Sequence, residues 1–289
     1  MLGGSRALGM RGPKTLSGFY RGQIPTTHLA WQEKTGLSST FPQEVNQRPK
    51  KLPATSTMIR LLAYNIKHGR GNDGRVDLQR TADVIRRVRA DVVALQEVDK
   101  KVERSGQLNE AKRLAELTGL PYHAFGSFFD YQGGEYGMAI ISRYPLRDIK
   151  RLRLPDGAEP RASLIVTVAA QKSFRLANVH FYRDERERLA QAQALLKYLQ
   201  NEKLPSVIAG DFNSRPKSAV LKLFADWNIP DKGEDHFTFP SDRPRVEIDF
   251  LMFRPENAFV VNEVDVVKES LASDHRPVLM EVSFGETNK

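Results

Sequence analysis

The 289-residue sequence contains no cysteine. This absence excludes disulfide bonds, zinc or iron–sulfur sites held by cysteine, and a thiol nucleophile. No run of about 18 or more apolar residues occurs, so we expect no transmembrane helix. No apolar run typical of a secretory signal lies near residue 1. These absences leave the compartment open, and a soluble cytoplasmic protein is the default expectation.

The positive charge is concentrated in the first part of the sequence. The chain has a formal net charge of +9, and residues 1–57 contribute +6 of it, with eight Lys or Arg against two acids. These residues are rich in Gly, Ser, Thr and Pro and show no sustained apolar period, so we expect a disordered basic extension. An organelle-targeting presequence or a true start at Met58 would each explain it. The rest carries only +3, which gives little support for nucleic-acid binding.

From Met58 onward, short apolar runs alternate with amphipathic segments. Helical spacing of apolar residues predicts helices over 77–89, 109–118, 185–200 and 217–226. The short apolar runs predict strands over 59–65, 91–97, 137–142, 163–169, 174–180, 207–211, 247–253, 259–267 and 277–284. Strands outnumber helices, and several are close enough in sequence to pair antiparallel. We therefore expect one α/β (α+β) domain over 58–289, built from mixed sheets covered by helices.

Polar side chains able to bind a metal ion or a phosphate follow five of the apolar runs. They are Asn65, Glu97, His180, the pair Asp211 and Asn213, and the pair Asp274 and His275. A sixth site is Asp249, which lies between Ile248 and Phe250 inside an apolar run. A carboxylate there is costly to bury unless a cation or hydrogen bonds compensate for it. Strands that deliver polar ends to one rim commonly build active sites.

Each of these residues also has an ordinary structural explanation when taken alone. Asp211 follows a glycine, as turn residues often do. Asn65 is a plausible helix cap, His180 a hydrogen-bonded residue at a strand end, and Ser273-Asp274 an Asx turn. Their joint occurrence at successive strand ends favours one shared site over five unrelated turns.

The chain from Met58 to Phe284 resembles the endonuclease/exonuclease/phosphatase superfamily, the DNase I-like fold, in its bacterial-type members. Six segments carry the resemblance, in the same order along the chain. They are Asn65-Ile, Leu95-Gln-Glu97-Val, Asn178-Val-His180, Gly210-Asp211-Phe-Asn213, Ile248-Asp249-Phe and Ser273-Asp274-His275-Arg-Pro277. The resemblance implies a four-layer α/β/β/α sandwich of two mixed sheets flanked by helices, with the site at one end of both sheets.

The resemblance also implies a metal site. Glu97 is expected to be the main metal ligand, with Asn65 and Asp274 at or near the ion. Oxygen ligands and the absence of cysteine favour a hard cation, Mg²⁺ or Mn²⁺, over zinc.

The remaining family positions imply catalytic roles. Asp249 and His275 are expected to form a dyad in which the carboxylate orients the imidazole and supports its protonated form. Asp211 and Asn213 are expected to position the attacking water, and His180 to assist the leaving group.

Four further residues are candidates for substrate binding on weaker grounds. They are His68, Arg70, Arg161 and Arg245. Guanidinium groups suit phosphate, but a solvated loop cation is an equally good explanation for each. Met138 stands where the family often has Asn, so a substrate contact is lost there.

These residues together predict a divalent-metal-dependent phosphoester hydrolase that uses in-line attack of water. A phosphodiesterase is favoured, and the substrate stays open among nucleic acid, phospholipid or sphingolipid head groups, inositol phosphates and small esters. The alternatives are a non-catalytic binding protein on the same fold and a nucleic-acid-binding module that uses the basic N-terminal segment. The sequence does not indicate an oligomeric state.

Overall fold

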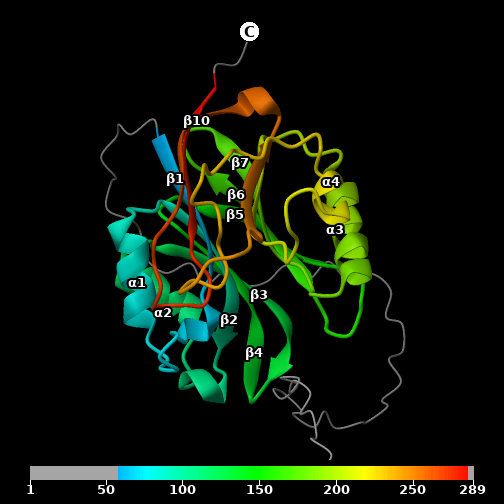
Figure 1. Ribbon diagram of the computed structural model, residues 1–289. Coiled ribbons are helices and arrows are strands. Elements are labelled where there is room, and N and C mark those ends of the chain that lie inside the picture. The colour runs from blue at the N-terminus through cyan, green and yellow to red at the C-terminus, as the bar shows by residue number, and fades with distance from the viewer. Residues whose placement is uncertain (1–57, 286–289) are drawn as a thin grey trace, which may run out of the picture. The chain divides into compact units, whose positions relative to one another are not determined.

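The computed structural model describes residues 58–285, and the extension expected over 1–57 lies outside the described residues (Figure 1). Two β-sheets pack face to face. The helices α1 and α2 cover the outer face of one sheet, and α3 and α4 cover the outer face of the other. This arrangement confirms the predicted four-layer sandwich of two mixed sheets.

The first sheet has six strands in the order β10-β11-β1-β2-β4-β3. Their bounds are β1 Met58–Asn65, β2 Val92–Lys100, β3 Tyr122–Tyr131, β4 Gly134–Ser142, β10 Phe259–Val266 and β11 Val278–Phe284. Only β1 and β2 are parallel; the other neighbours in this sheet are antiparallel.

The second sheet has five strands in the order β5-β6-β7-β8-β9. Their bounds are β5 Leu146–Arg153, β6 Ala162–Ala169, β7 Ser173–His180, β8 Ser206–Asp211 and β9 Asp249–Arg254. Here β7 and β8 form the parallel pair, and the other neighbours are antiparallel.

Four α-helices and three short 3₁₀ turns occur in the described residues. The α-helices are α1 Leu78–Arg87, α2 Glu110–Thr118, α3 Glu185–Leu199 and α4 Ala219–Lys222, and the turns are η1 Lys67–Gly69, η2 Glu103–Ser105 and η3 Glu256–Ala258. Asp77 and Asp184 cap α1 and α3, because each carboxylate accepts hydrogen bonds from the backbone of the first turn. Within residues 58–285, no helix is long and apolar enough to cross a membrane.

Three hydrophobic clusters separate the four layers, and strand periodicity explains them. Leu61 of β1 and Val207 of β8 lie in the cluster between the two sheets. Leu62, the next residue of β1, packs instead in the cluster that contains Ile85 of α1. Ile208 of β8 lies in the third cluster, with residues of α3 and α4. Because successive side chains point to opposite faces, strands buried on both faces read as continuous apolar runs.

The topology brings the polar strand ends to one edge of the sandwich. A crossover helix joins each parallel pair, so the carboxyl ends of β1 and β2 share an edge, as do those of β7 and β8. The strands β9 and β11 run antiparallel to their neighbours, and their first residues therefore lie at the same edge.

The structure differs from the sequence-based expectation at three elements. Strands β3 and β5 were not predicted, because β3 contains a glycine and β5 has four exposed basic residues in an edge position. The helix expected over 217–226 is a single turn, Ala219–Lys222, which Ser218 caps through its side chain. The expected strands and the other three helices are present, with ends shifted by a few residues at most.

A buried polar contact connects the two sheets behind the site. The amide nitrogen of Asn178 in β7 donates to the carbonyl oxygens of Leu95 and Ala139 in the first sheet, at 2.9 Å each. The Gln96 amide nitrogen donates to Asn178 Oδ1 at 2.7 Å. The backbone of β8 comes close here, since a Cβ on Gly210 would lie 3.1 Å from Gln96 Nε2 and 2.0 Å from Val179 O. This contact fixes how the two sheets are aligned.

We expect Asn178→Leu to lower the free energy of unfolding by about 2–4 kcal/mol, because two carbonyl groups and the Gln96 amide would lose a buried partner. Urea unfolding measures the loss. Asn262→Leu, an exposed asparagine on β10, is the matched control and should change stability by less than about 0.5 kcal/mol. Equal stability of Asn178→Leu and the wild type would contradict the proposed alignment role.

Candidate active site

Glu97 reaches the edge of the first sheet through a β-bulge. Gln96 pairs with Met138, and Val98 pairs with the adjacent Gly137, so Glu97 is an additional residue in β2 with φ +56°. Bulges and left-handed backbone at non-glycine residues are commonly found at functional sites. Gly137 is required opposite the bulge, because a Cβ there would lie 2.0 Å from Gly126 O.

Asn65 at the end of β1 links carboxylates from both sheets. Its side-chain nitrogen donates to Glu97 Oε1 at 3.1 Å and to Asp211 Oδ2 at 3.3 Å. Its side-chain oxygen accepts from the backbone nitrogen of Lys67 at 3.2 Å. The amide therefore lies between the acid of the first sheet and the acid of the second.

Asp274 joins the site from the loop before β11. The Lys67 ammonium donates to Asp274 Oδ2 at 2.6 Å, and both side chains are partly exposed. The neighbouring Ser273 hydroxyl donates to the Asn65 carbonyl oxygen at 2.7 Å, which holds this loop against the end of β1. Lys67 and His68 both have left-handed φ values, 47° and 45°, so this turn is strained.

Asp249 and His275 are in direct contact. His275 Nδ1 lies 2.9 Å from Asp249 Oδ2, and both residues are buried. Burial alone would lower the pKa of His275, but the charge and hydrogen bond of Asp249 outweigh it and raise the pKa to about 10. The imidazole is therefore a cation at neutral pH.

Asp211 lies at the centre of the cluster. Its Oδ2 is 3.4 Å from His180 Nε2 and 3.8 Å from His275 Nε2, and its Oδ1 accepts from the backbone nitrogen of Asn213 at 2.8 Å. Burial and the charge of Asp249 raise the pKa of Asp211 to about 7. A carboxyl group with such a pKa can exchange a proton near neutral pH.

His180 differs from His275 in its environment. Burial, followed by the charge of Arg161, holds the pKa of His180 well below its ordinary value. Its Nδ1 lies 3.2 Å from Arg161 Nη1. Both imidazoles therefore lie within 4 Å of the same carboxylate, that of Asp211. The pKa of His275 is raised, whereas the pKa of His180 is lowered.

The donor set at Glu97 suits a hard cation. Burial raises the pKa of Glu97, the Asn65 hydrogen bond lowers it, and the nearby charge of Asp274 raises it again. No ion pair reaches Glu97 within residues 58–285, and the positive charges of His275 and Arg161 are smaller influences that lower its pKa. Carboxylate and amide oxygens are the ligands that Mg²⁺ and Mn²⁺ prefer. Asp211, Asp249 and His275 also bring potential ligand atoms within 4.8 Å of one another.

The four weaker candidates are dispersed. Arg161 contacts the cluster through His180. Arg70 and Arg245 are exposed, and no hydrogen bond or ion pair in the described range connects their side chains to the cluster. His68 is buried near Asp99 and Arg104, and burial together with Arg104 lowers its pKa to about 4.

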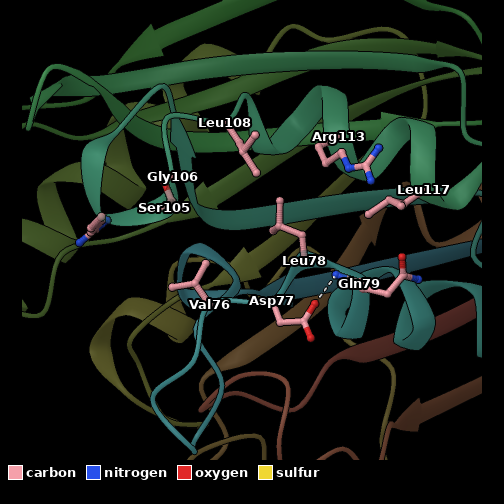
Figure 2. Close-up of a pocket in the computed structure, with 10 residues that line it drawn as sticks. Val76, Asp77, Leu78, Gln79, Ser105, Gly106, Leu108, Arg113 and Leu117 are labelled. Carbon is pink, nitrogen blue, oxygen red and sulfur yellow. Dashed lines mark hydrogen bonds between the residues drawn. The ribbon is translucent and has the colours of Figure 1, made fainter.

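A hollow of about 440 Å³ lies on the helix-covered side of the first sheet, away from the cluster (Figure 2). It lies between the start of α1 and the segment that joins η2 to α2. Its lining residues are Val76, Asp77, Leu78, Gln79, Arg104, Ser105, Gly106, Leu108, Arg113 and Leu117. None of the eight residues predicted to carry the chemistry lines it, so the hollow is separate from the cluster.

Sequence reasoning missed residues that support the cluster. Gln96 and Asn178 align the sheets, and Lys67 neutralises Asp274. Gln96 and Asn178 were visible as polar residues inside strands that are otherwise apolar. Nothing in the sequence distinguished Lys67 from other loop cations.

Comparison with known proteins identifies the family to which the chain belongs. The sequence profile of the Endonuclease/Exonuclease/phosphatase family matches residues 62–275. The uncharacterized protein YbhP of Escherichia coli is 27% identical over 243 residues, which cover 78% of this chain and 96% of YbhP.

Solved structures share the fold. An endonuclease/exonuclease/phosphatase from Beutenbergia cavernae superposes with a TM-score of 0.65 at 24% identity, over 79% of this chain and 72% of that one. A mannosyl-6-phosphatase from Bacteroides thetaiotaomicron gives 0.62 at 17% identity, over 78% and 100%. The chain described here belongs to the Endonuclease/Exonuclease/phosphatase family.

Proposed function

We propose that this protein is a divalent-metal-dependent hydrolase of phosphoesters. The observation that carries the proposal is the position of Asp211. Its carboxylate lies within 4 Å of the side chains of Asn65, His180 and His275, at the edge where both sheets end. A carboxylate near pKa 7 beside a cationic and a neutral imidazole suits hydrolysis of a phosphate ester by water.

A cation held by Glu97 and Asp274, with Asn65 beside it, would neutralise charge on the non-bridging phosphate oxygens. Asn65 orients Glu97, and Lys67 stays close to Asp274 as a second positive charge for the phosphate. A metal at these three residues leaves the hydrogen bond between Asp249 and His275 intact, whereas a metal held by His275 and both acids would compete with it.

The other residues would act on water and substrate. Asp211, positioned by the backbone of Asn213, accepts a proton from the attacking water. His275, kept cationic by Asp249, donates a hydrogen bond to a phosphate oxygen. His180 Nε2 lies beside the Asp211 carboxylate and would donate a hydrogen bond to the oxygen of the leaving group.

A panel of phosphoesters is needed to identify the substrate class, because the described surface does not favour one class over another. A mannosyl-6-phosphatase shares the fold, so monoesters belong in the panel beside diesters. We suggest p-nitrophenyl phosphate, bis-p-nitrophenyl phosphate, plasmid, abasic oligonucleotide, sphingomyelin and inositol phosphates, each with Mg²⁺, Mn²⁺ or EDTA.

We expect Glu97→Gln to lower metal-dependent hydrolysis by about 100-fold or more, because the carboxylate charge that holds the cation is removed. Rates on the preferred substrate of the panel, with melting temperatures as a check on folding, measure the effect. Glu135→Gln, at a partly exposed acid paired with Lys100, is the control and should keep the wild-type rate. Activity in EDTA equal to that in Mg²⁺ or Mn²⁺ would refute the metal-dependent function.

The cationic state proposed for His275 predicts a pH-dependent stability. The folded pKa is about 10 against an ordinary value of 6.5, so the folded state retains a proton that the unfolded chain releases. The stabilisation is therefore complete below pH 6.5 and is lost as the pH rises through 10.

We expect the difference in free energy of unfolding between wild type and His275→Gln, measured in EDTA, to shrink as the pH rises from 6.5 to 10. His236→Gln serves as the control, because within residues 58–285 the His236 ring lies against the nearby Gly233 carbonyl and the neighbouring Phe237 ring and forms no ion pair with an acid. A difference that stays constant over this range would show that His275 is not held as a cation.

A further inference from the structure

We infer that Arg161 is a positioning residue that holds His180 as a neutral imidazole with its proton on Nε2. The sequence suggested Arg161 as a direct substrate contact, and the structure supports a different role. The inference deepens the proposed hydrolysis and rests on it for its catalytic consequence, but the tautomer itself can be measured independently.

Both terminal nitrogens of the Arg161 guanidinium already have partners, whereas its buried Nε has none within the described residues. Nη1 lies 3.2 Å from His180 Nδ1, and Nη2 lies 2.7 Å from Glu159 Oε1. The rings of Phe128 and Tyr182 lie 5.0 and 5.5 Å from the guanidinium carbon. Arg161 is only 7% exposed, so little of it is accessible to a substrate.

The contact determines where the His180 proton resides. Arginine has five N–H donors, no acceptor, and stays protonated in proteins. An imidazole nitrogen facing it must therefore accept the hydrogen bond through a lone pair. His180 Nδ1 is the accepting atom, which leaves Nε2 as the protonated one.

The surrounding charges keep His180 neutral. Its imidazole is faced by Arg161 on one side and by Asp211 and His275 on the other. A second proton on Nδ1 would break the bond with Arg161 and bring two cations together. Asp211 favours a cation at His180, but burial and Arg161 oppose it, and the pKa of His180 is well below its ordinary value.

The bulge in β3 contributes to this arrangement. Ser127 pairs with Gly137 and Phe129 with Tyr136, so Phe128 is an additional residue in the strand. Its ring contacts both partners, at 5.0 Å from the Arg161 guanidinium and 6.4 Å from the His180 ring. Stacking against the Phe128 ring holds the Arg161 guanidinium in the orientation that reaches His180 Nδ1.

The consequence for the reaction is specific. His180 donates a hydrogen bond from Nε2 to the leaving oxygen and keeps its proton, because a neutral imidazole is a weak acid. A hydrogen bond fixed in this direction stabilises developing charge without reorganisation.

The first test is nuclear magnetic resonance of the full-length protein labelled with ¹⁵N-histidine. The chain has six histidines, and the loss of one set of signals in His180→Gln assigns His180. We expect the neutral Nε2–H tautomer from pH 6.5, the ordinary histidine pKa, to pH 9. A proton on Nδ1, or full protonation within this range, would overturn the inference, whether or not the protein proves to be a hydrolase.

The second test uses variants of Arg161. Arg161→Met removes the donor, and we expect the His180 tautomer to become mixed and kcat to fall by about 100-fold with KM nearly unchanged. Arg161→Lys retains a charged donor and should restore part of the tautomer and of kcat. Arg113→Met, at an exposed arginine of α2, should leave both readouts unchanged.

Two outcomes of the variant experiment would overturn the inference. A raised KM with an unaltered His180 tautomer would assign Arg161 to direct substrate binding. An unaltered tautomer with an unaltered rate would leave Arg161 without a role at His180. Absence of hydrolysis in the wild type, with the expected tautomers, would instead refute the proposed function alone.

Discussion

The site depends on the alignment of two sheets that share no backbone hydrogen bond. Asn65 and Glu97 belong to one sheet, whereas His180, Asp211 and Asp249 belong to the other. Apolar packing between sheets is non-directional and allows them to slide. The buried amides of Gln96 and Asn178 are directional, so they select one alignment. The geometry of the candidate site therefore depends on a buried polar contact between the two sheets.

The two histidines illustrate how neighbours assign chemistry to identical side chains. Both imidazoles are buried and face Asp211, and burial alone would make both neutral. The partner of Nδ1 decides the outcome, because Asp249 accepts a hydrogen bond from the His275 ring, whereas Arg161 donates a hydrogen bond to the His180 ring. The site therefore contains a cation and a neutral donor on either side of one carboxylate.

Much of this arrangement could be predicted from the sequence, and the reasons for the rest are physical. The central strands were predictable because both faces are buried, and Asn65, Asp211 and His275 because polar residues follow apolar runs. Strand β5 was not, because an exposed charged edge lacks the apolar signal. The partners of His180 depend on contacts between distant segments, which no local pattern encodes.

The bulge at Glu97 adds one residue to β2 that the pairing of the strand does not require. Leu95 and Val98 both pack on the helix-covered face, and the Gln96 side chain lies between the sheets. The side chains of β2 therefore alternate between the two faces in regular order when Glu97 is left out. Loss of the single codon for Glu97 would therefore leave a regular strand with every other side chain on its proper face. A related chain without this residue could keep the scaffold and lack the proposed metal ligand, which makes residue 97 the first position to inspect in related chains.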